Sequence, residues 1–252
     1  MKITKTILKA VGVLAFWLAL WALCAYAVGK PQLVLPYPTS VANKLAAMLG
    51  TGDFYIVCLT SLAKIFIGLV AGILSGVLLA VATKLASPAD ALVSPAVEVV
   101  KATPVASVII LLFFILDSGA IPSLVSALMV VPIMFSNVRR GIETAPENAL
   151  EVARIYDFSG AKKVRLIYLP SVMPYFTAGC RSALGLAWKA GIAAEVICTP
   201  ESSIGTMLYN ARIYLDAESL FAWTAVVVMM SFVIEKLLIW ALGKLLKGGE
   251  TI

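Results

Sequence analysis

The chain has 252 residues, of which 61% are hydrophobic and 13% are charged, and its mean hydropathy is +0.98. Because a soluble globular domain carries about 25% charged residues, this composition excludes an ordinary soluble domain and indicates an integral membrane protein. The net charge of +6 does not point to nucleic acid, since the basic residues stand at the ends of apolar runs. We therefore expect membrane lipid, and no nucleic acid, among its partners.

The sequence carries no motif for a metal or a nucleotide. It has no histidine, and its four cysteines lie in or beside apolar segments without a CxxC pair, which argues against a zinc site. The GxxxxGK[ST] sequence of a P-loop is also missing. We expect a non-catalytic subunit without a metal or cofactor of its own. If ATP drives its work, ATP and Mg²⁺ bind to a separate ATPase subunit.

Long apolar runs predict an all-α membrane protein with six transmembrane helices in a single domain, 1–252. The predicted spans cover residues 10–28, 62–83, 91–116, 118–138, 171–199 and 219–243. At about 1.5 Å per residue, each run is long enough to cross a hydrocarbon core of ~30 Å. The first run also resembles a signal peptide, because Ala25 and Ala27 form an A-x-A site, but its length favours a span.

Three glycines in the second span, Gly68, Gly72 and Gly76, repeat every four residues. Such a groove allows another helix to approach closely. Two interpretations of this helix-packing face remain open. It is either a contact that moves during gating or a static packing seam.

Ionisable residues within spans are costly and indicate function by default. Lys101, Lys189 and Glu195 are therefore our candidates for the translocation path. Lys101 stands three residues after Glu98 on one helical face, so these two can instead neutralise each other. Lys189 and Glu195 are six residues apart and point about 120° away from each other, which argues against a private ion pair. An ion-coupled secondary transporter would use the same residues as a relay, but we find none of the inverted repeats that it predicts.

Residues 143–170 form the one long polar stretch and lie between the fourth and fifth spans. Thr144 and Glu147 fit a capping box, which predicts a helix starting at Thr144. The spacing of Ala149, Val152, Ala153 and Tyr156 predicts one apolar face on this helix. Ser159 can cap a second short helix that runs to Tyr168. The stretch therefore predicts a helix-turn-helix loop at a membrane surface.

The sequence EVARIYDFSGAKKVRLIYLP, with Glu151, Ala153, Leu169 and Pro170 at characteristic spacing, resembles the cytoplasmic EAA loop of permease subunits in binding-protein-dependent ABC importers. Two further stretches, LPYPTSV near the N-terminus and SALGLAWKAGIAAEV in the fifth span, resemble the nitrate, sulfonate, bicarbonate and taurine branch of these importers. One position departs from the pattern: Asp157 stands where the family usually has glycine. Asp tolerates a left-handed turn better than most residues, so we expect the turn to survive.

The resemblance implies a homodimer of this chain, two ABC ATPase subunits and an extracytoplasmic solute-binding protein. It also implies a small solute, a nitrate-like, sulfonate-like or taurine-like anion or a vitamin precursor. Lysines from two protomers suit an anion, whereas Glu195 suits a zwitterion or an amine equally well. In this interpretation Glu151 fixes the loop through a hydrogen bond or ion pair, and basic residues meet the ATPase. The implied coupling residues are Ala149, Glu151, Ala153, Arg154, Asp157, Lys162, Lys163, Leu169 and Pro170.

The distribution of basic residues predicts the orientation. With six spans and a cytoplasmic N-terminus, the inner segments hold 12 of the 20 Lys and Arg residues, whereas the outer segments hold only Lys30, Lys44 and Arg212. The positive-inside rule then places both termini and the 143–170 loop in the cytoplasm. We expect a multi-pass protein of the plasma membrane.

Overall fold

The computed structural model describes residues 2–30 and 33–249, and over these residues the chain is helical without any strand. The long helices are α1 (Lys2–Val28), α3 (Gly52–Leu85), α6 (Ile121–Glu143), α9 (Leu169–Cys198) and α11 (Ala217–Gly249). The shorter elements are α2 (Pro38–Leu49), α4 (Ser87–Ala102), α5 (Val105–Phe113), α7 (Glu147–Ile155), α8 (Gly160–Lys163), a π-helical turn (Val164–Tyr168) and α10 (Ile204–Ile213). The predicted fold class, an all-α membrane protein, agrees with this architecture.

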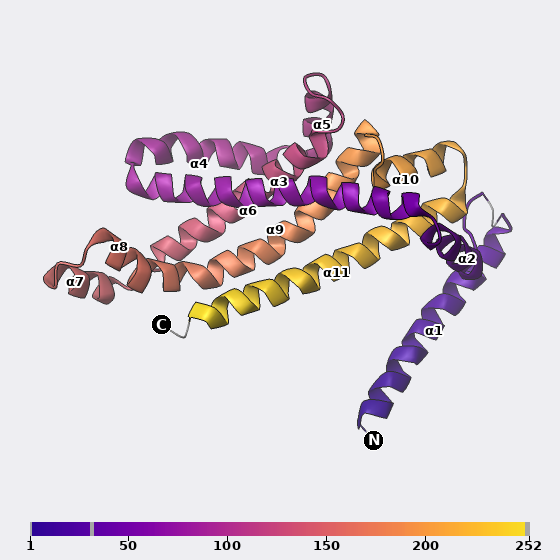
Figure 1. The fold of residues 1–252 in the computed structure, drawn as a ribbon, viewed down its shortest axis with the longest axis horizontal. Helices are drawn as coiled ribbons and strands as arrows, with labels where there is room; N and C mark the ends of the chain where they lie inside the picture. The colour runs from indigo at the N-terminus through magenta and orange to yellow at the C-terminus, as the bar shows by residue number, and fades with distance from the viewer. Residues whose placement is uncertain (1, 31–32, 250–252) are drawn as a thin grey trace.

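The helices form an elongated bundle in which α6 packs against both α3 and α9. Figure 1 shows α7 and α8 at one end of this bundle and α2 and α10 at the opposite end. Helix α4 folds back beside α3, and α11 runs along α9. The N-terminal part of α1 diverges from the bundle, and most of the apolar side chains between Val11 and Val28 are exposed.

Helices α3 and α6 pack closely at three glycines of α3. A Cβ atom on Gly68 would lie 2.1 Å from the Ser123 carbonyl oxygen, and one on Gly72 would lie 2.6 Å from the Val130 Cβ. Distances below 3.0 Å do not occur between real Cβ atoms and their neighbours, so these positions require glycine. Gly76 lies against Met134 in the same way. The glycine groove read from the sequence therefore faces α6.

Among the described residues, four helical segments are long and apolar enough to cross a membrane: Val11–Val28, Gly52–Leu85, Ile121–Glu143 and Ala217–Lys244. The predicted third span, 91–116, is not a single helix. Its two parts, α4 and α5, are bent by 100° at Thr103 and Pro104, and they make a fifth span only if the bent pair is counted as one. Pro104 has no backbone N–H and disfavours helical geometry at the residue before it, so the helix breaks here.

The predicted fifth span coincides with α9, which has 30 residues. It is long enough to cross a bilayer, but it is not among the strongly apolar segments because Arg181, Lys189 and Glu195 interrupt it. Six spans therefore remain a prediction, while four or five are supported by length and composition.

Candidate coupling site

The polar segment forms a compact unit that begins one turn later than predicted. Helix α7 starts at Glu147 after Pro146, and no side chain caps it. The Thr144 hydroxyl instead donates to the Arg140 carbonyl at 3.0 Å, so Thr144 ends α6. The predicted capping box is therefore wrong. Helix α6 continues to Glu143, and the Thr144 hydroxyl bonds to a carbonyl of that helix and not to the first turn of α7.

Helix α7 ends in a Schellman motif built around Asp157. The Phe158 N–H donates to the Ala153 carbonyl at 2.9 Å, and the Asp157 N–H donates to the Arg154 carbonyl at 3.2 Å. Asp157 has φ 45°, in the left-handed region that this motif requires. The expectation that Asp157 preserves the turn is confirmed.

The inward face of α7 differs from the predicted one. Ala153 is fully buried and forms a small core with Ala145 and Ile167, against which Ala149 and Leu150 also pack. Val152 and Tyr156, which periodicity assigned to the same face, are 46% and 72% exposed. The chain turns back at Asp157 and brings Phe158 and Ile167 onto the alanine side of the helix. This contact with Phe158 and Ile167 determines which face of α7 is buried, and the periodicity of α7 alone does not reveal it.

The second part of the loop follows the prediction at its start. The Ser159 hydroxyl accepts a hydrogen bond from the Lys162 N–H at 3.3 Å, which confirms Ser159 as the N-cap of α8. The Lys162 ammonium lies 3.8 Å from the centroid of the Phe158 ring, a cation–π contact that steadies the turn. After Lys163 a wide π-helical turn leads directly into α9, so the loop is continuous with a long helix of the bundle.

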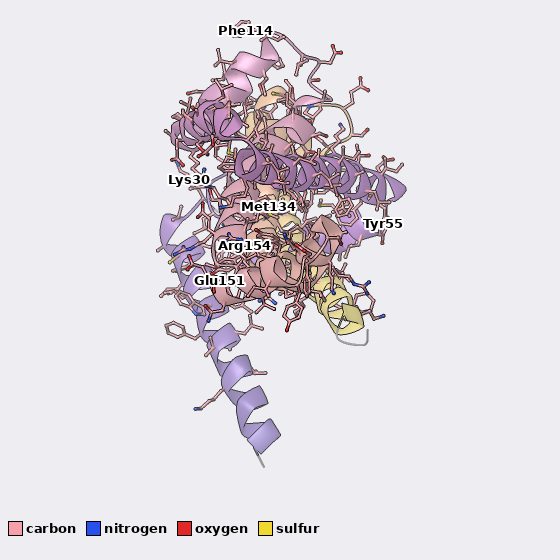
Figure 2. The ribbon with its side chains drawn as sticks, turned by 90° about the vertical axis from the view of Figure 1, so that its left-hand side faces the viewer. Lys30, Tyr55, Phe114, Met134, Glu151 and Arg154 are labelled. Atoms are coloured by element: carbon pink, nitrogen blue, oxygen red, sulfur yellow. The ribbon has the colours of Figure 1, made fainter. Side chains whose placement is uncertain are left out.

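The other predicted coupling residues lie on the outside of this unit. Glu151 and Arg154 are exposed at the end of the molecule that faces the viewer in Figure 2. Lys163 is half-buried, and Leu169 and Pro170 are exposed in the first turn of α9. Among the described residues, no hydrogen bond or ion pair involves the Glu151 side chain. The predicted internal bond from Glu151 is therefore absent here, and its carboxylate is free to meet another molecule.

Helix α7 presents a mixed surface to solvent, which we call the docking surface: Glu147, Glu151, Val152, Arg154, Ile155 and Tyr156. Ile155 is 77% exposed, and sequence reasoning missed it. Its signal in the sequence is a large apolar residue that follows Arg154 and stands one turn after Glu151 on a short polar helix. Contiguous apolar side chains rimmed by charges mark protein contact sites.

A charged cluster holds the base of this unit to the rest of the bundle. The Arg139 guanidinium in α6 pairs with Asp90 in α4, and its Nε donates to Glu143 at 3.0 Å. The same guanidinium donates to the Ser94 hydroxyl. Arg139 thus ties the end of α6 to α4, and the π-helical turn joins the α7–α8 unit to α9.

The three residues predicted for the translocation path are not brought together. Lys101 pairs with Glu98 at 2.7 Å on the exposed face of α4, which agrees with mutual neutralisation. Lys189 is exposed on α9 and borders a cavity of about 370 Å³ between α9 and α11.

Glu195, the third residue predicted for the path, is enclosed by neighbouring helices of the same chain. Its side chain is fully buried. One carboxylate oxygen accepts hydrogen bonds from the Ser61 hydroxyl at 2.8 Å and from the Gly205 N–H at 3.0 Å. The Ser61 oxygen in turn accepts from the Ile204 N–H at 2.9 Å. Glu195 thereby joins α9 to α3 and to the first turn of α10.

Comparison with known proteins identifies the class to which this architecture belongs. The family of binding-protein-dependent transport system inner membrane components matches residues 68–242, more than half of the chain. The chain belongs to this family of transport permeases, which confirms the resemblance drawn from the polar segment.

Relatives within the family point to the predicted branch. The taurine transport system permease protein TauC of Escherichia coli (strain K12) is 24% identical over 240 residues, which cover 92% of this chain and 86% of that protein. The putative aliphatic sulfonates transport permease protein SsuC of the same strain is 27% identical over 202 residues, covering 79% and 76%. A crystal structure of an amino acid ABC transporter with histidines covers 76% of this chain and 93% of its own, with a TM-score of 0.58 at 18% identity. It shares the fold.

Proposed function

We propose that this permease forms, as a homodimer, the translocation path of an ATP-driven importer. Two separate ATPase subunits bind ATP and Mg²⁺, and an extracytoplasmic solute-binding protein delivers a small sulfonate-like or taurine-like solute. Both termini and the docking surface lie in the cytoplasm in this proposal. The names of the relatives support the solute class.

The observation that carries the proposal is the docking surface at one end of the bundle. It combines an exposed isoleucine and tyrosine with unpaired charges on a helix that is held rigidly by the Ala153 core and the Schellman turn. A rigid knob of this kind suits a groove on a partner and transmits a rigid-body shift rather than absorbing it. The π-helical turn into α9 and the Arg139 pair with α4 carry the shift into the bundle.

The proposal is tested by purifying the assembled transporter through a tag on this chain and measuring both the recovered ATPase subunit and its hydrolysis rate. Ile155→Glu places a charge in the centre of the docking surface. We expect at least about a tenfold loss of recovered ATPase, since removing a contact at an interface centre costs about 2 kcal/mol.

The matched control is Ile213→Glu, because Ile213 is 55% exposed on α10 at the opposite end of the bundle. It should leave ATPase recovery unchanged. Replacing residues 143–170 by Gly and Ser should abolish recovery. Equal recovery from all variants would refute docking through this segment.

A further inference from the structure

Three exposed charged side chains midway along the long helices α9 and α11 have no partner of opposite charge among the described residues. Arg181 and Lys189 stand more than about 12 Å from either end of α9 at ~1.5 Å per residue, and Glu235 stands near the middle of α11. None of the ion pairs found among residues 2–30 and 33–249 includes any of the three. Contact with lipid would be costly for such groups, so they face a polar space or another molecule.

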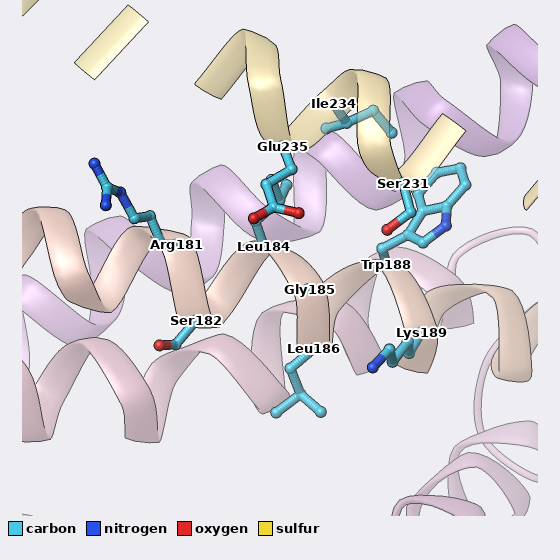
Figure 3. A pocket seen from close by; sticks show the side chains of 10 residues that line it. All are labelled: Arg181, Ser182, Leu184, Gly185, Leu186, Trp188, Lys189, Ser231, Ile234 and Glu235. Carbon is cyan, nitrogen blue, oxygen red and sulfur yellow. The ribbon is translucent and has the colours of Figure 1, made fainter. Parts of the chain in front are cut away.

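These three residues border the same cavity of about 370 Å³ between α9 and α11. In Figure 3, Arg181 lies at one end of the cavity and Lys189 at the other, and the Glu235 carboxylate reaches over α9 between them. The Ser182 and Ser231 hydroxyls line the same space. The cavity falls within the size range of small-molecule sites, about 300–1,000 Å³.

The cavity owes its depth to Gly185 in the centre of its α9 wall. A Cβ atom on Gly185 would meet no atom within 4 Å, in contrast to the glycines of the α3 groove. Its role is therefore not close helix packing. The missing side chain leaves open space between the two basic residues.

The charges of the cavity define the ligand that it suits. Two cations and one carboxylate leave a net charge of +1, which a single anionic group neutralises. A guanidinium binds two oxygens of a sulfonate or carboxylate through parallel hydrogen bonds, and a serine hydroxyl can donate to the third oxygen of a sulfonate. A dianion would bring a second negative charge close to the Glu235 carboxylate, and the two negative charges would repel each other.

We propose that the cavity between α9 and α11 is a binding site for a small organic monoanion, with Arg181 and Lys189 attracting the acid group and Glu235 excluding dianions. The physiological role of this site rests on the proposed function, because the site would let the permease itself select the solute. Binding to the cavity is nevertheless testable without ATP hydrolysis or a solute-binding protein.

The test uses thiol modification of Ser231→Cys in the purified full chain, in a Cys24→Ser background because Cys24 is exposed while Cys58, Cys180 and Cys198 are buried. Rates are measured with sulfonatoethyl and trimethylammonioethyl methanethiosulfonate and divided by their rates with a free thiol in solution. We expect the anionic reagent to be favoured. Arg181→Gln or Lys189→Gln should reduce this preference at least about threefold, and Glu235→Gln should increase it.

The control is Lys236→Gln, which removes a neighbouring charge on α11 that does not border the cavity. It should leave the preference unchanged. Methanesulfonate should slow the modification, and sulfate at equal ionic strength should not until Glu235→Gln is introduced. A preference that none of the cavity substitutions alters, or equal protection by both anions, would overturn the proposal. Ser182→Cys provides a second reporter if the first variant folds poorly.

A second variant fills the cavity. A Cβ atom at Gly185 meets no atom within 4 Å, and Gly185→Leu removes a glycine from a helix interior, so the variant should not destabilise the chain. We expect modification of Ser231→Cys to slow at least about tenfold, since the side chain occupies the path to the thiol. Gly243→Leu, also with nothing within 4 Å but outside the cavity, should have no such effect. Unchanged modification in Gly185→Leu would contradict the assigned site, independently of any result on ATPase docking.

Discussion

At the scale of single residues, Glu195 is the clearest case of a functional-looking group with a structural role. Two donors, the Ser61 hydroxyl and the Gly205 N–H, converge on one of its oxygens. The N-terminus of α10 adds a favourable partial positive charge. A Cβ atom on Gly205 would lie 2.2 Å from the Glu195 Cβ, so the glycine permits the approach of α10 that makes these bonds possible.

This arrangement predicts different effects for two substitutions of Glu195. Glu195→Ala removes the acceptor and leaves buried donors and a void, which should destabilise the chain by roughly 3 kcal/mol. Glu195→Gln should cost much less, because its amide oxygen can still accept both hydrogen bonds. Thermal unfolding in detergent measures the difference. Glu201→Ala, at an exposed position, serves as control. Equal stability of Glu195→Ala and wild type would show that the hydrogen bonds of Glu195 do not stabilise the fold.

At the scale of elements, the α3–α6 seam depends on the absence of side chains. Gly72→Leu would place its Cβ 2.6 Å from the Val130 Cβ and 2.7 Å from the Ala127 carbonyl oxygen. The two helices must separate to accept it, and overpacking of this kind typically costs 1–3 kcal/mol. We expect the thermal midpoint to fall, while Gly52→Leu, in the same helix with nothing within 4 Å, leaves it unchanged. A fall in both variants would point to a cause other than the seam.

The stability contributed by the ion pair between Lys44 in α2 and Asp216, which precedes α11, should depend on pH. Burial raises the pKa of Asp216, but hydrogen bonds from Ser219 and the contact with Lys44 at 3.3 Å outweigh it, and the pKa is lowered overall. A lowered pKa means that the ionised form stabilises the fold. This stabilisation is complete above the unfolded pKa of about 3.9 and is lost as the pH falls through the lower folded value.

Asp216→Asn tests this junction, because asparagine retains the N-cap of α11 but loses the charge. Wild type should be more stable than the variant at pH 6, by at most about 1 kcal/mol for so accessible a pair. The difference should shrink as the pH falls below the unfolded pKa of about 3.9. Unfolding midpoints of both proteins between pH 6 and pH 2 provide the measurement, and a difference that does not change over this range would exclude the ionic contribution.

At the scale of the whole molecule, the bundle separates two polar ends. Helices α7 and α8 lie at one end, and α2 and α10 lie at the other. The six inner-side basic residues between Arg139 and Arg165 belong to the first end. This separation, together with the positive-inside rule, predicts that the two ends face opposite sides of the membrane.

Cysteine labelling tests this orientation. In a Cys24→Ser background, Asn43→Cys on α2 should react with a membrane-impermeant maleimide added to right-side-out vesicles, and Lys162→Cys on α8 should react only after permeabilisation. Both positions are exposed, so access alone does not distinguish them. Reaction of both from the same side would contradict the topology, and a reversed pattern would place the docking surface outside the cell.

Several local features were predictable from the sequence because their causes are local. Long apolar runs have a single stable form in a membrane, the helix, since its backbone groups satisfy one another. Asp157 was expected to tolerate a left-handed turn, and it has φ 45°. Ser159 caps α8 through its own near neighbour, Lys162. Each of these needs only a few consecutive residues.

The sequence by itself therefore determined the class of fold, the family and the position of the polar segment 143–170. The tertiary structure decided which groups meet. The burial of Glu195, the exposure of Val152 and Tyr156, and the cavity beside Gly185 all depend on which helix lies opposite. A helix's periodicity states which residues share a face, but the partner that covers this face comes from a distant part of the chain. For that reason the charged residues of α9, which look alike in the sequence, have different surroundings. Glu195 is buried and hydrogen-bonded to α3 and α10, whereas Arg181 and Lys189 border an open cavity.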